Sequence, residues 1–157
     1  MKIALLSDTH GNKKLIEKIL PRLTRADLVI HLGDHFYDMD KFIPQLGDKL
    51  VTVYGNCDGG GEDKILVKEG VKILVCHGDK YRVKSGLTRI YLKALEIGAK
   101  LVLYGHTHVA RIDYEQDVTL INPGSMTHFG RKSYCEIQID DGVINAQIVD
   151  VDKNESF

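Results

Sequence analysis

The sequence has almost no net charge and few cysteines. Its 157 residues include 21 basic and 22 acidic side chains, which gives a formal net charge of −1. This balance gives no support for binding of bulk nucleic acid, which usually requires a basic patch or stripe. The three cysteines, Cys57, Cys76 and Cys135, are odd in number and form no C-x-x-C pair. We therefore expect no disulfide framework, and a reducing compartment.

Long hydrophobic runs are also absent near the N-terminus. The first apolar run, residues 3–6, is far too short for a signal peptide or a membrane span. We therefore expect a cytoplasmic protein without membrane association. The length fits one domain, residues 1–157, which can bury a hydrophobic core without disulfides. Homo-oligomerisation is a further possibility. The charged, aperiodic residues 150–157 predict a loose tail.

Short apolar runs alternate with helical patterns in the first two thirds of the chain. Five runs rich in β-branched residues predict buried strands, at residues 3–6, 28–32, 50–53, 71–76 and 101–104. Apolar stripes predict helices over residues 15–23 and 87–95. Pro21 is expected to end or kink the first helix, and Gly98 to stop the second.

The last third of the chain has a different pattern. Residues 118–121, 134–139 and 143–149 alternate like half-buried strands, and Asp140-Asp141-Gly142 is a hairpin signal. The fold class is therefore α/β, with mostly strands at the end.

Metal-capable side chains follow each of the five buried runs, always beside a glycine. Ligands in α/β sheets collect at the carboxyl ends of strands, so side chains at such ends converge if the strands share a sheet. Within an extended segment, residues i and i+2 also point to the same side. Glycine permits close backbone approach or a positive φ. The predicted site residues are Asp8, His10, Asp34, Asn56, His77, His106 and His108.

The kinds of side chain in this set indicate a metal site. Carboxylates, an amide and imidazoles suit Mn²⁺, Zn²⁺, Fe or Ni²⁺, whereas a soft thiolate site would need a cysteine cluster. Seven ligands exceed the four of one tetrahedral ion. Two ions roughly 3.5–4 Å apart, bridged by a carboxylate, account for the surplus.

These motifs, in this order, resemble a known family. The blocks Asp8-x-His10, Gly33-Asp34, Gly55-Asn56-x-Asp58, His77-Gly78 and Gly105-His106-Thr107-His108 are similar to those of the calcineurin-like metallophosphoesterases. The small size, the sequence Asn56-Cys57-Asp58 and the segment Asn122-Pro123-Gly124-Ser125 narrow the resemblance to the YfcE-type branch of small microbial phosphodiesterases. The resemblance covers the chain from Asp8 to about Ser125.

The resemblance implies a two-sheet mixed β-sandwich flanked by helices, and a division of the ligands. Asp8, His10 and His108 would bind one metal, Asn56, His77 and His106 the other, and Asp34 would bridge them. Mn²⁺ is the expected cofactor, with Ni²⁺, Fe or Zn²⁺ as alternatives. The larger phosphatases carry a histidine, thought to protonate the leaving group, where this chain has Cys57, so the general acid is left open.

The expected reaction is hydrolysis of a small phosphoester. Two divalent ions lower the pKa of a shared water from ~15.7 to about 7, which provides hydroxide at neutral pH. Asn56 and His77, with the metals, would stabilise the charge on the phosphoryl oxygens. Two ions, Asp8, Asp34 and a hydroxide leave about one positive charge, which favours a diester. A dianionic monoester would need a further cation, such as Arg131 or Lys132.

Several other residues have two interpretations. Asp58 either orients a ligand or shapes the turn before Gly59, and Cys57 either stands in for the acid or, as we favour, fills space. We expect Cys76 and His31 to lie in the core. His35 and His128 either border the substrate pocket or lie in exposed loops, the second being favoured. Asn122 and Ser125 either line the site or form a plain turn.

Three functions are compatible with these residues. The first is a dinuclear metal-dependent phosphodiesterase, and the second is a phosphomonoesterase that uses the same site. The third is a non-catalytic interaction scaffold, because a eukaryotic trafficking subunit resembles these enzymes but has lost key ligands. All seven ligand positions are intact in this chain, which favours an enzyme.

Overall fold

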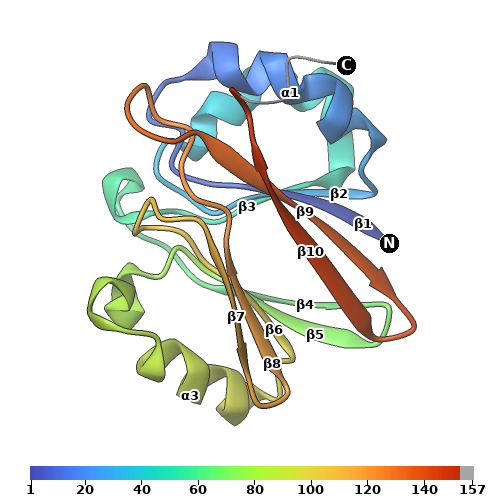
Figure 1. The fold of residues 1–157 in the computed structure, drawn as a ribbon. Helices are drawn as coiled ribbons and strands as arrows, with labels where there is room; N and C mark the ends of the chain where they lie inside the picture. The colour runs from blue at the N-terminus through green and yellow to red at the C-terminus, as the bar shows by residue number, and fades with distance from the viewer. Residues whose placement is uncertain (153–157) are drawn as a thin grey trace.

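Two five-stranded β-sheets lie at the centre of the molecule, with helices on their outer faces (Figure 1). The computed structural model describes residues 1–152. The first sheet contains, in spatial order, β10 (Val143–Asp150), β9 (Ser133–Asp140), β1 (Lys2–Leu6), β2 (Leu28–His31) and β3 (Leu50–Thr52). The second contains β4 (Lys64–Lys68), β5 (Val71–Val75), β6 (Leu101–Leu103), β8 (Val118–Asn122) and β7 (Arg111–Glu115). The predicted two-sheet α/β sandwich is thus confirmed.

Within residues 1–152, the helices are three α-helices and five 3-10 helices. The α-helices are α1 (Lys13–Arg25), α2 (Ile43–Leu46) and α3 (Thr88–Ile97). The 3-10 helices are η1 (Phe36–Phe42), η2 (Gly47–Lys49), η3 (Asn56–Asp58), η4 (Asp79–Tyr81) and η5 (Val83–Ser85). In Figure 1, α1 lies above the first sheet and α3 below the second. None of the described helices is long and apolar enough to cross a membrane.

Alternation along the strands divides the core into three layers. In β1, Ile3 and Leu5 pack into the cluster shared by the two sheets, whereas Ala4 and Leu6 pack into the cluster that includes residues of α1. A third cluster joins α3 to the second sheet. Successive side chains of a strand point to opposite faces, so one apolar run serves two layers. This explains why the run is apolar throughout rather than alternating.

Parallel pairing sets the position of the site. β1 pairs in parallel with β2, and β2 with β3. In the second sheet β5 pairs in parallel with β6, and β6 with β8. The carboxyl ends of these strands therefore lie at the same edge of each sheet, and the loops that leave them carry the predicted ligands.

Most predicted elements are confirmed, and Gly98 and the hairpin match in detail. Gly98 ends α3 at φ 72°, with its N–H bonded to the carbonyls of Ala94 and Leu95. Asp141 and Gly142 have φ values of 48° and 79°, as a tight hairpin between β9 and β10 requires. Strands β4 and β7 were not predicted, because both are edge strands with several exposed side chains and no clear apolar pattern.

Two local predictions were wrong in part. Pro21 does not end its helix, since α1 continues to Arg25, and the alternative that Pro21 kinks the helix stays a prediction. Pro21 is exposed, so water can satisfy the carbonyl that its missing N–H leaves free. The tail is ordered at its start, because Asp150 belongs to β10 and Val151 is buried. Residues 153–157 of that tail lie outside the described residues.

Candidate metal centre

The predicted ligands come from loops at the carboxyl edges of both sheets rather than from one sheet. Asp8, Asp34 and Asn56 follow strands β1, β2 and β3 of the first sheet. His10 also follows β1, whereas the other three histidines come from the second sheet, His77 after β5 and His106 and His108 after β6. Six of the seven residues form two groups whose ligand atoms lie within 4.8 Å of one another.

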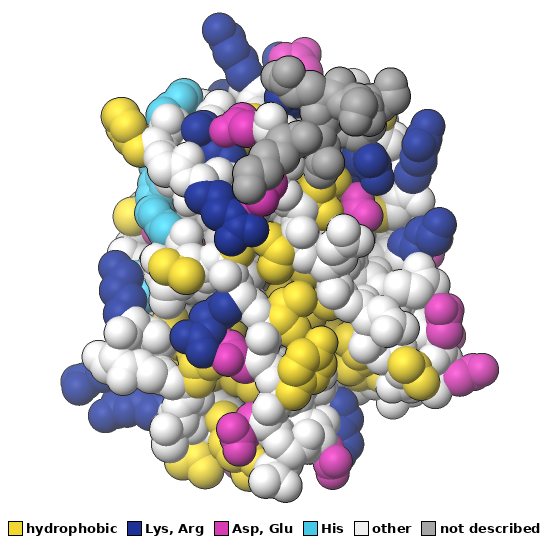
Figure 2. Space-filling view, in the orientation of Figure 1, with side chains coloured by type: hydrophobic (Ala, Val, Ile, Leu, Met, Phe, Trp, Pro, Cys, Tyr) yellow, Lys and Arg dark blue, Asp and Glu magenta, His cyan; other side chains and the backbone are white. Residues whose placement is uncertain are grey.

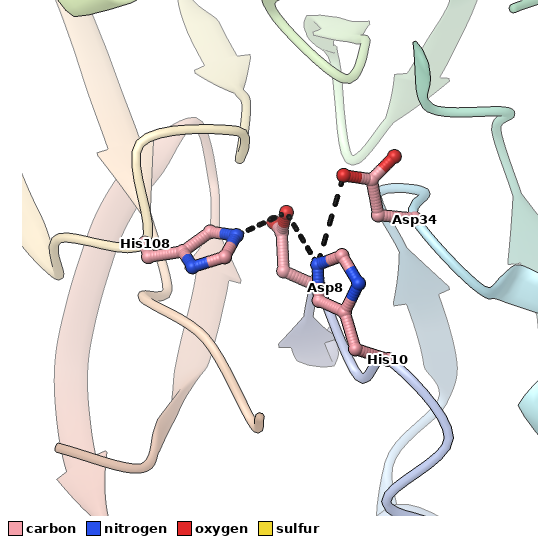
Figure 3. Close-up of side chains that lie close together, drawn as sticks. All are labelled: Asp8, His10, Asp34 and His108. Carbon is pink, nitrogen blue, oxygen red and sulfur yellow. Dashed lines mark ion pairs between the residues drawn. The ribbon is translucent and has the colours of Figure 1, made fainter. Parts of the chain in front are cut away.

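The first group consists of Asp8, His10, Asp34 and His108 (Figure 3). His108 Nε2 lies 3.0 Å from Asp8 Oδ1. His10 Nε2 lies between the two carboxylates, 3.8 Å from Asp8 Oδ1 and 3.7 Å from Asp34 Oδ2. Nitrogen and oxygen donors of four side chains on three loops therefore point into one small volume.

The second group consists of Asp34, His77 and His106. His77 Nε2 lies 3.5 Å from Asp34 Oδ2 and 3.2 Å from His106 Nδ1. His77 Nδ1 donates to the carbonyl of Leu32 at 2.7 Å, which leaves Nε2 free to face the group. Asp34 is the residue that both groups share.

The hydrogen bonding of the first group fits a bound cation. Asp8 Oδ1 and His10 Nε2 are buried and make no hydrogen bond with any described residue. Such unsatisfied buried atoms are costly unless another partner is present. Carboxylate and imidazole donors suit divalent Mn, Zn, Fe or Ni, so the residues present fit metal ions.

The backbone at the centre is conformationally unusual. Five of the predicted ligands adopt positive φ, namely Asp8 at 54°, His10 at 43°, Asp34 at 60°, His106 at 68° and His108 at 62°. A non-glycine residue in this region costs about 1–3 kcal/mol and persists where the surroundings enforce it. The expectation of extended segments at Asp8–His10 and His106–His108 was therefore wrong, although each pair still converges.

Glycines allow the loops to pack this closely. A Cβ at Gly33 would lie 2.8 Å from the Cα of Gly55, and one at Gly55 would overlap the Asp34 carboxylate. A Cβ at Gly105 would lie 2.7 Å from Asp8 Oδ2. The predicted need for close backbone approach is confirmed at these three positions.

The two carboxylates are held in the charged form. Burial raises the pKa of Asp8, but contacts with His10 and His108 and the charge of His77 outweigh it, so the pKa lies far below its usual range. Burial opposes ionisation of Asp34 as well, yet His77 and the Cys57 N–H lower its pKa. Both residues therefore offer anionic oxygens at neutral pH.

The histidines respond to these carboxylates in different ways. The side chain of Asp8 raises the pKa of His10. Burial disfavours protonation of His77, but Asp34 and Asp8 outweigh burial and raise its pKa. Burial, with the charges of His77 and Lys84, lowers the pKa of His106. The field of the centre therefore favours positive charge near Asp8 and Asp34.

Asp58 both orients a ligand and shapes a turn. Its Oδ2 accepts the N–H of Asp34 at 2.8 Å and that of Gly55 at 2.9 Å, and its Oδ1 accepts the N–H of His35 at 2.8 Å. Cys57 adds an N–H bond of 2.9 Å to Asp34 Oδ1. Asp34 is thus fixed at its backbone and at its carboxylate by the η3 turn.

His31 and Asp38 support the loop that carries Asp8 and His10. His31 is fully buried, and its Nδ1 accepts the N–H of Gly33 at 3.1 Å. Its Nε2 then carries the proton and donates to Thr9 Oγ1 at 3.0 Å. The Thr9 hydroxyl donates to Asp38 Oδ2 at 2.7 Å. The core position predicted for His31 is confirmed, but no sequence pattern distinguished Asp38 or Thr9.

Asn122 fixes the loop of the last two histidines. Its Nδ2 donates to the carbonyl of Gly105 and to Thr107 Oγ1, both at 2.9 Å, and its Oδ1 accepts the N–H of Gly124. Ser125 is buried beside this turn. Asn122 therefore stabilises the loop that carries His106 and His108, and it also stabilises the local turn.

The remaining candidates lie around the centre. The ring of His35 is 5.1 Å from that of His10, so His35 borders the centre, whereas His128 is in an exposed loop. Asn56 is exposed, with Nδ2 3.8 Å from Cys57 Sγ. Cys57 is exposed, so the space-filling interpretation was wrong, while Cys76 is buried as predicted.

Comparison with known proteins agrees with this geometry. The model of the calcineurin-like phosphoesterase superfamily domain matches residues 1–142. This chain belongs to the calcineurin-like phosphoesterase superfamily. It is therefore a metal-dependent phosphoesterase, and the two groups that share Asp34 could each hold a metal ion.

Individual relatives are moderately similar. The probable metallophosphoesterase YsnB of Bacillus subtilis is 35% identical over 130 residues, covering 80% of this chain and 75% of that protein. The phosphodiesterase MJ0936 of Methanocaldococcus jannaschii is 29% identical over 149 residues, covering 79% and 83%. A crystal structure of a predicted phosphoesterase from Streptococcus pneumoniae superimposes with a TM-score of 0.78 at 25% identity, covering 96% of this chain and 90% of that one.

Proposed function

We propose that the protein is a phosphodiesterase with two divalent metal ions in one centre. The observation that carries this proposal is that Asp34 belongs to both ligand groups. One group holds Asp8, His10 and His108, and the other holds His77 and His106. Asn56, next to Cys57 in the η3 turn, completes the second group in this proposal.

The chain supplies charge and position for the reaction. When bound, the two ions provide hydroxide at neutral pH and stabilise negative charge on the phosphoryl group. Asp8 and Asp34 would hold the ions, while His77 and Asn56 would stabilise the charge on the phosphoryl oxygens. The bonds from Asp58, Thr9 and Asn122 fix these side chains before substrate binds, which lowers the cost of reorganisation.

The charges around the centre favour a diester over a monoester. Arg131 is paired with Asp150, and Lys132 Nζ lies 3.5 Å from Asp152 Oδ2, so both cations are engaged elsewhere. A dianionic monoester therefore finds little added positive charge in that loop. Lys84, whose charge acts on His106, is the cation that would serve the alternative phosphomonoesterase.

The proposed metal is chosen from the chemistry of the ligands, and the proposed cytoplasmic location from the state of the cysteines. Mn²⁺ is the metal we propose, since two carboxylates and four imidazoles form a donor set of intermediate hardness. The three cysteines are free, and Cys57 is exposed, as in a protein of the cytoplasm.

The shared ligand gives the sharpest test of the two-metal proposal. Elemental analysis of protein saturated with Mn²⁺ should give two ions per chain. Asp34→Asn should lose at least one ion and most of the hydrolysis of bis(p-nitrophenyl) phosphate. Asp117→Asn is the matched control, because Asp117 is an exposed acid in the turn between β7 and β8, where it pairs with Lys100. Full metal content and activity in Asp34→Asn would overturn the proposal.

A second assay decides the substrate class. In Mn²⁺, we expect faster turnover of bis(p-nitrophenyl) phosphate than of p-nitrophenyl phosphate. Faster turnover of the monoester would favour the phosphomonoesterase. If Lys84 serves that reaction, Lys84→Met should slow monoester turnover more than diester turnover. Hydrolysis of neither ester, with two ions bound, would leave the scaffold as the better explanation.

A further inference from the structure

A row of aromatic rings extends from the metal centre over η1 to the end of β3. The centroid of the His35 ring lies 5.1 Å from the centroid of the His10 ring and 5.1 Å from that of the Tyr37 ring. Phe36 follows, 5.8 Å from Tyr37, and stacks on Tyr54 at 4.3 Å with an angle of 10° between the planes. The row therefore begins at a metal-facing histidine and ends at a stacked pair.

The row is held rigidly at its inner end. Tyr37 Oη and His35 Nδ1 are joined by a hydrogen bond of 2.9 Å. The backbone of His35 is fixed on both sides, by its N–H bond to Asp58 and by its carbonyl, which accepts the Asp38 N–H at 2.9 Å. A rigid surface loses little conformational entropy when a ligand binds to it.

The rings are also open to solvent. Tyr37 is 45% exposed and Tyr54 is 47% exposed, although neighbouring side chains of η1 such as Met39 and Phe42 are buried. In the space-filling view, histidine side chains gather on one side of the molecule, with hydrophobic side chains beside them (Figure 2). The η1 segment thus places aromatic side chains outside the core and beside the centre.

The chemistry of the row selects a flat, uncharged group. The row consists of five rings and contains no Lys, Arg, Asp or Glu side chain. It would therefore recognise a ligand by stacking and not by charge. The five rings are those of His10, His35, Tyr37, Phe36 and Tyr54. Aromatic side chains stack on nucleobases of any sequence. A phosphate held at the metal centre would place its attached nucleoside within reach of Tyr37.

We propose that the row binds the nucleobase of a small nucleoside phosphoester, whose phosphate lies at the metal centre. This substrate class rests on the proposed function. The net charge of −1 favours a mononucleotide unit over a long nucleic acid, which would need a basic track.

Binding of two matched phosphates tests the proposal apart from catalysis. Calorimetric titration of the Mn²⁺-saturated protein with adenosine 5′-monophosphate and with ribose 5-phosphate compares ligands that differ only in the base. We expect the nucleotide to bind about tenfold more tightly, which is within the range of one base stacked on an aromatic ring. Equal affinities, including no measurable binding of either ligand, would overturn the proposal.

Substitutions then locate the effect. Tyr37→Ala should reduce the preference for the nucleotide to less than about threefold, whereas Tyr37→Phe should keep it, because the ring remains. Tyr54→Ala tests the outer end of the row if Tyr37→Ala fails to fold. Tyr114→Ala is the control, since Tyr114 is 69% exposed on β7 and outside the row. A full preference in both alanine variants of the row would also overturn the assignment.

The proposed function and this inference fail in different ways. Hydrolysis of bis(p-nitrophenyl) phosphate is measured on the same preparation. If the protein hydrolyses this diester but binds the two phosphates equally, only the nucleobase assignment is lost. If it prefers the nucleotide but hydrolyses no phosphoester, the proposed function is lost and the binding row remains.

Discussion

Asp58 Oδ2 accepts the backbone N–H of Asp34 at 2.8 Å, and this bond joins the η3 turn to the ligand that both groups share. The same carboxylate accepts from Gly55 and His35. One side chain outside the ligand set therefore determines the backbone position of Asp34, which has a φ of 60°.

Asp58→Asn should weaken metal binding without removing a ligand. The amide loses charge and one acceptor oxygen, so at least one of the three N–H groups loses its partner. We expect Mn²⁺ affinity to fall about 10–100-fold and the metal-free protein to lose about 1–3 kcal/mol of unfolding free energy. Calorimetric titration and urea unfolding measure the two effects. Asp113→Asn is the control, and unchanged affinity in Asp58→Asn would show that the bond is dispensable.

Gly105→Ala should disrupt the first ligand group through packing alone. The new Cβ would lie 2.7 Å from Asp8 Oδ2, the oxygen that accepts the N–H of His106. We expect the loss of at least half of the bound Mn²⁺ by elemental analysis. Gly60→Ala provides a comparison, because it strains a positive φ of 74° but meets no atom within 4 Å. Similar metal content in the two variants would refute the packing explanation.

His31 should make the metal-free protein less stable as the pH falls. Burial lowers its pKa to about 4, whereas an unfolded histidine has a pKa near ~6.5. The unfolded chain therefore takes up this proton first, and stability that is present above pH ~6.5 is lost as the pH falls toward 4. The loss attributable to His31 is on the order of 3 kcal/mol.

The contribution of His31 can be separated from that of the carboxylates. His31→Asn keeps an acceptor near the N–H of Gly33 but does not titrate. Urea unfolding with EDTA, at pH 7 and pH 4.5, should show a smaller loss of stability in the variant than in the wild type. An equal pH dependence in both proteins would mean that His31 is protonated without cost.

Cys57→Ala should leave turnover nearly unchanged, even for a poor leaving group. Partial burial and the charge of Asp34 raise the pKa of the thiol, so it is a poor proton donor at neutral pH. The bond from residue 57 to Asp34 comes from the backbone and survives the substitution. Steady-state kinetics on an alkyl phosphodiester should agree with the wild type within about twofold, and a much larger decrease would identify Cys57 as the acid.

The identity of the ligands was available from the sequence because their positions depend on local patterns. Each metal-capable residue follows a short apolar run, and the strands, the Gly98 stop and the β9–β10 hairpin depend on neighbouring residues alone. Such patterns are strong because burial and turn geometry constrain each short segment separately. The choice of Asp8, Asp34 and the four histidines as candidate ligands also used the order of the five motifs, which resembles that of the calcineurin-like metallophosphoesterases.

The tertiary structure decided how these residues are held. The ligands come from two sheets rather than one, and positive φ values, not extended segments, bring Asp8 and His10 together. The hydrogen bond from Thr9 to Asp38 joins residues 29 positions apart in the sequence, and the bond from Asp34 to Asp58 joins residues 24 positions apart. No local pattern encodes such contacts, because they exist only after β1, β2 and β3 have paired. The sequence by itself therefore determined which side chains are candidate ligands, and the pairing of the strands determined their geometry.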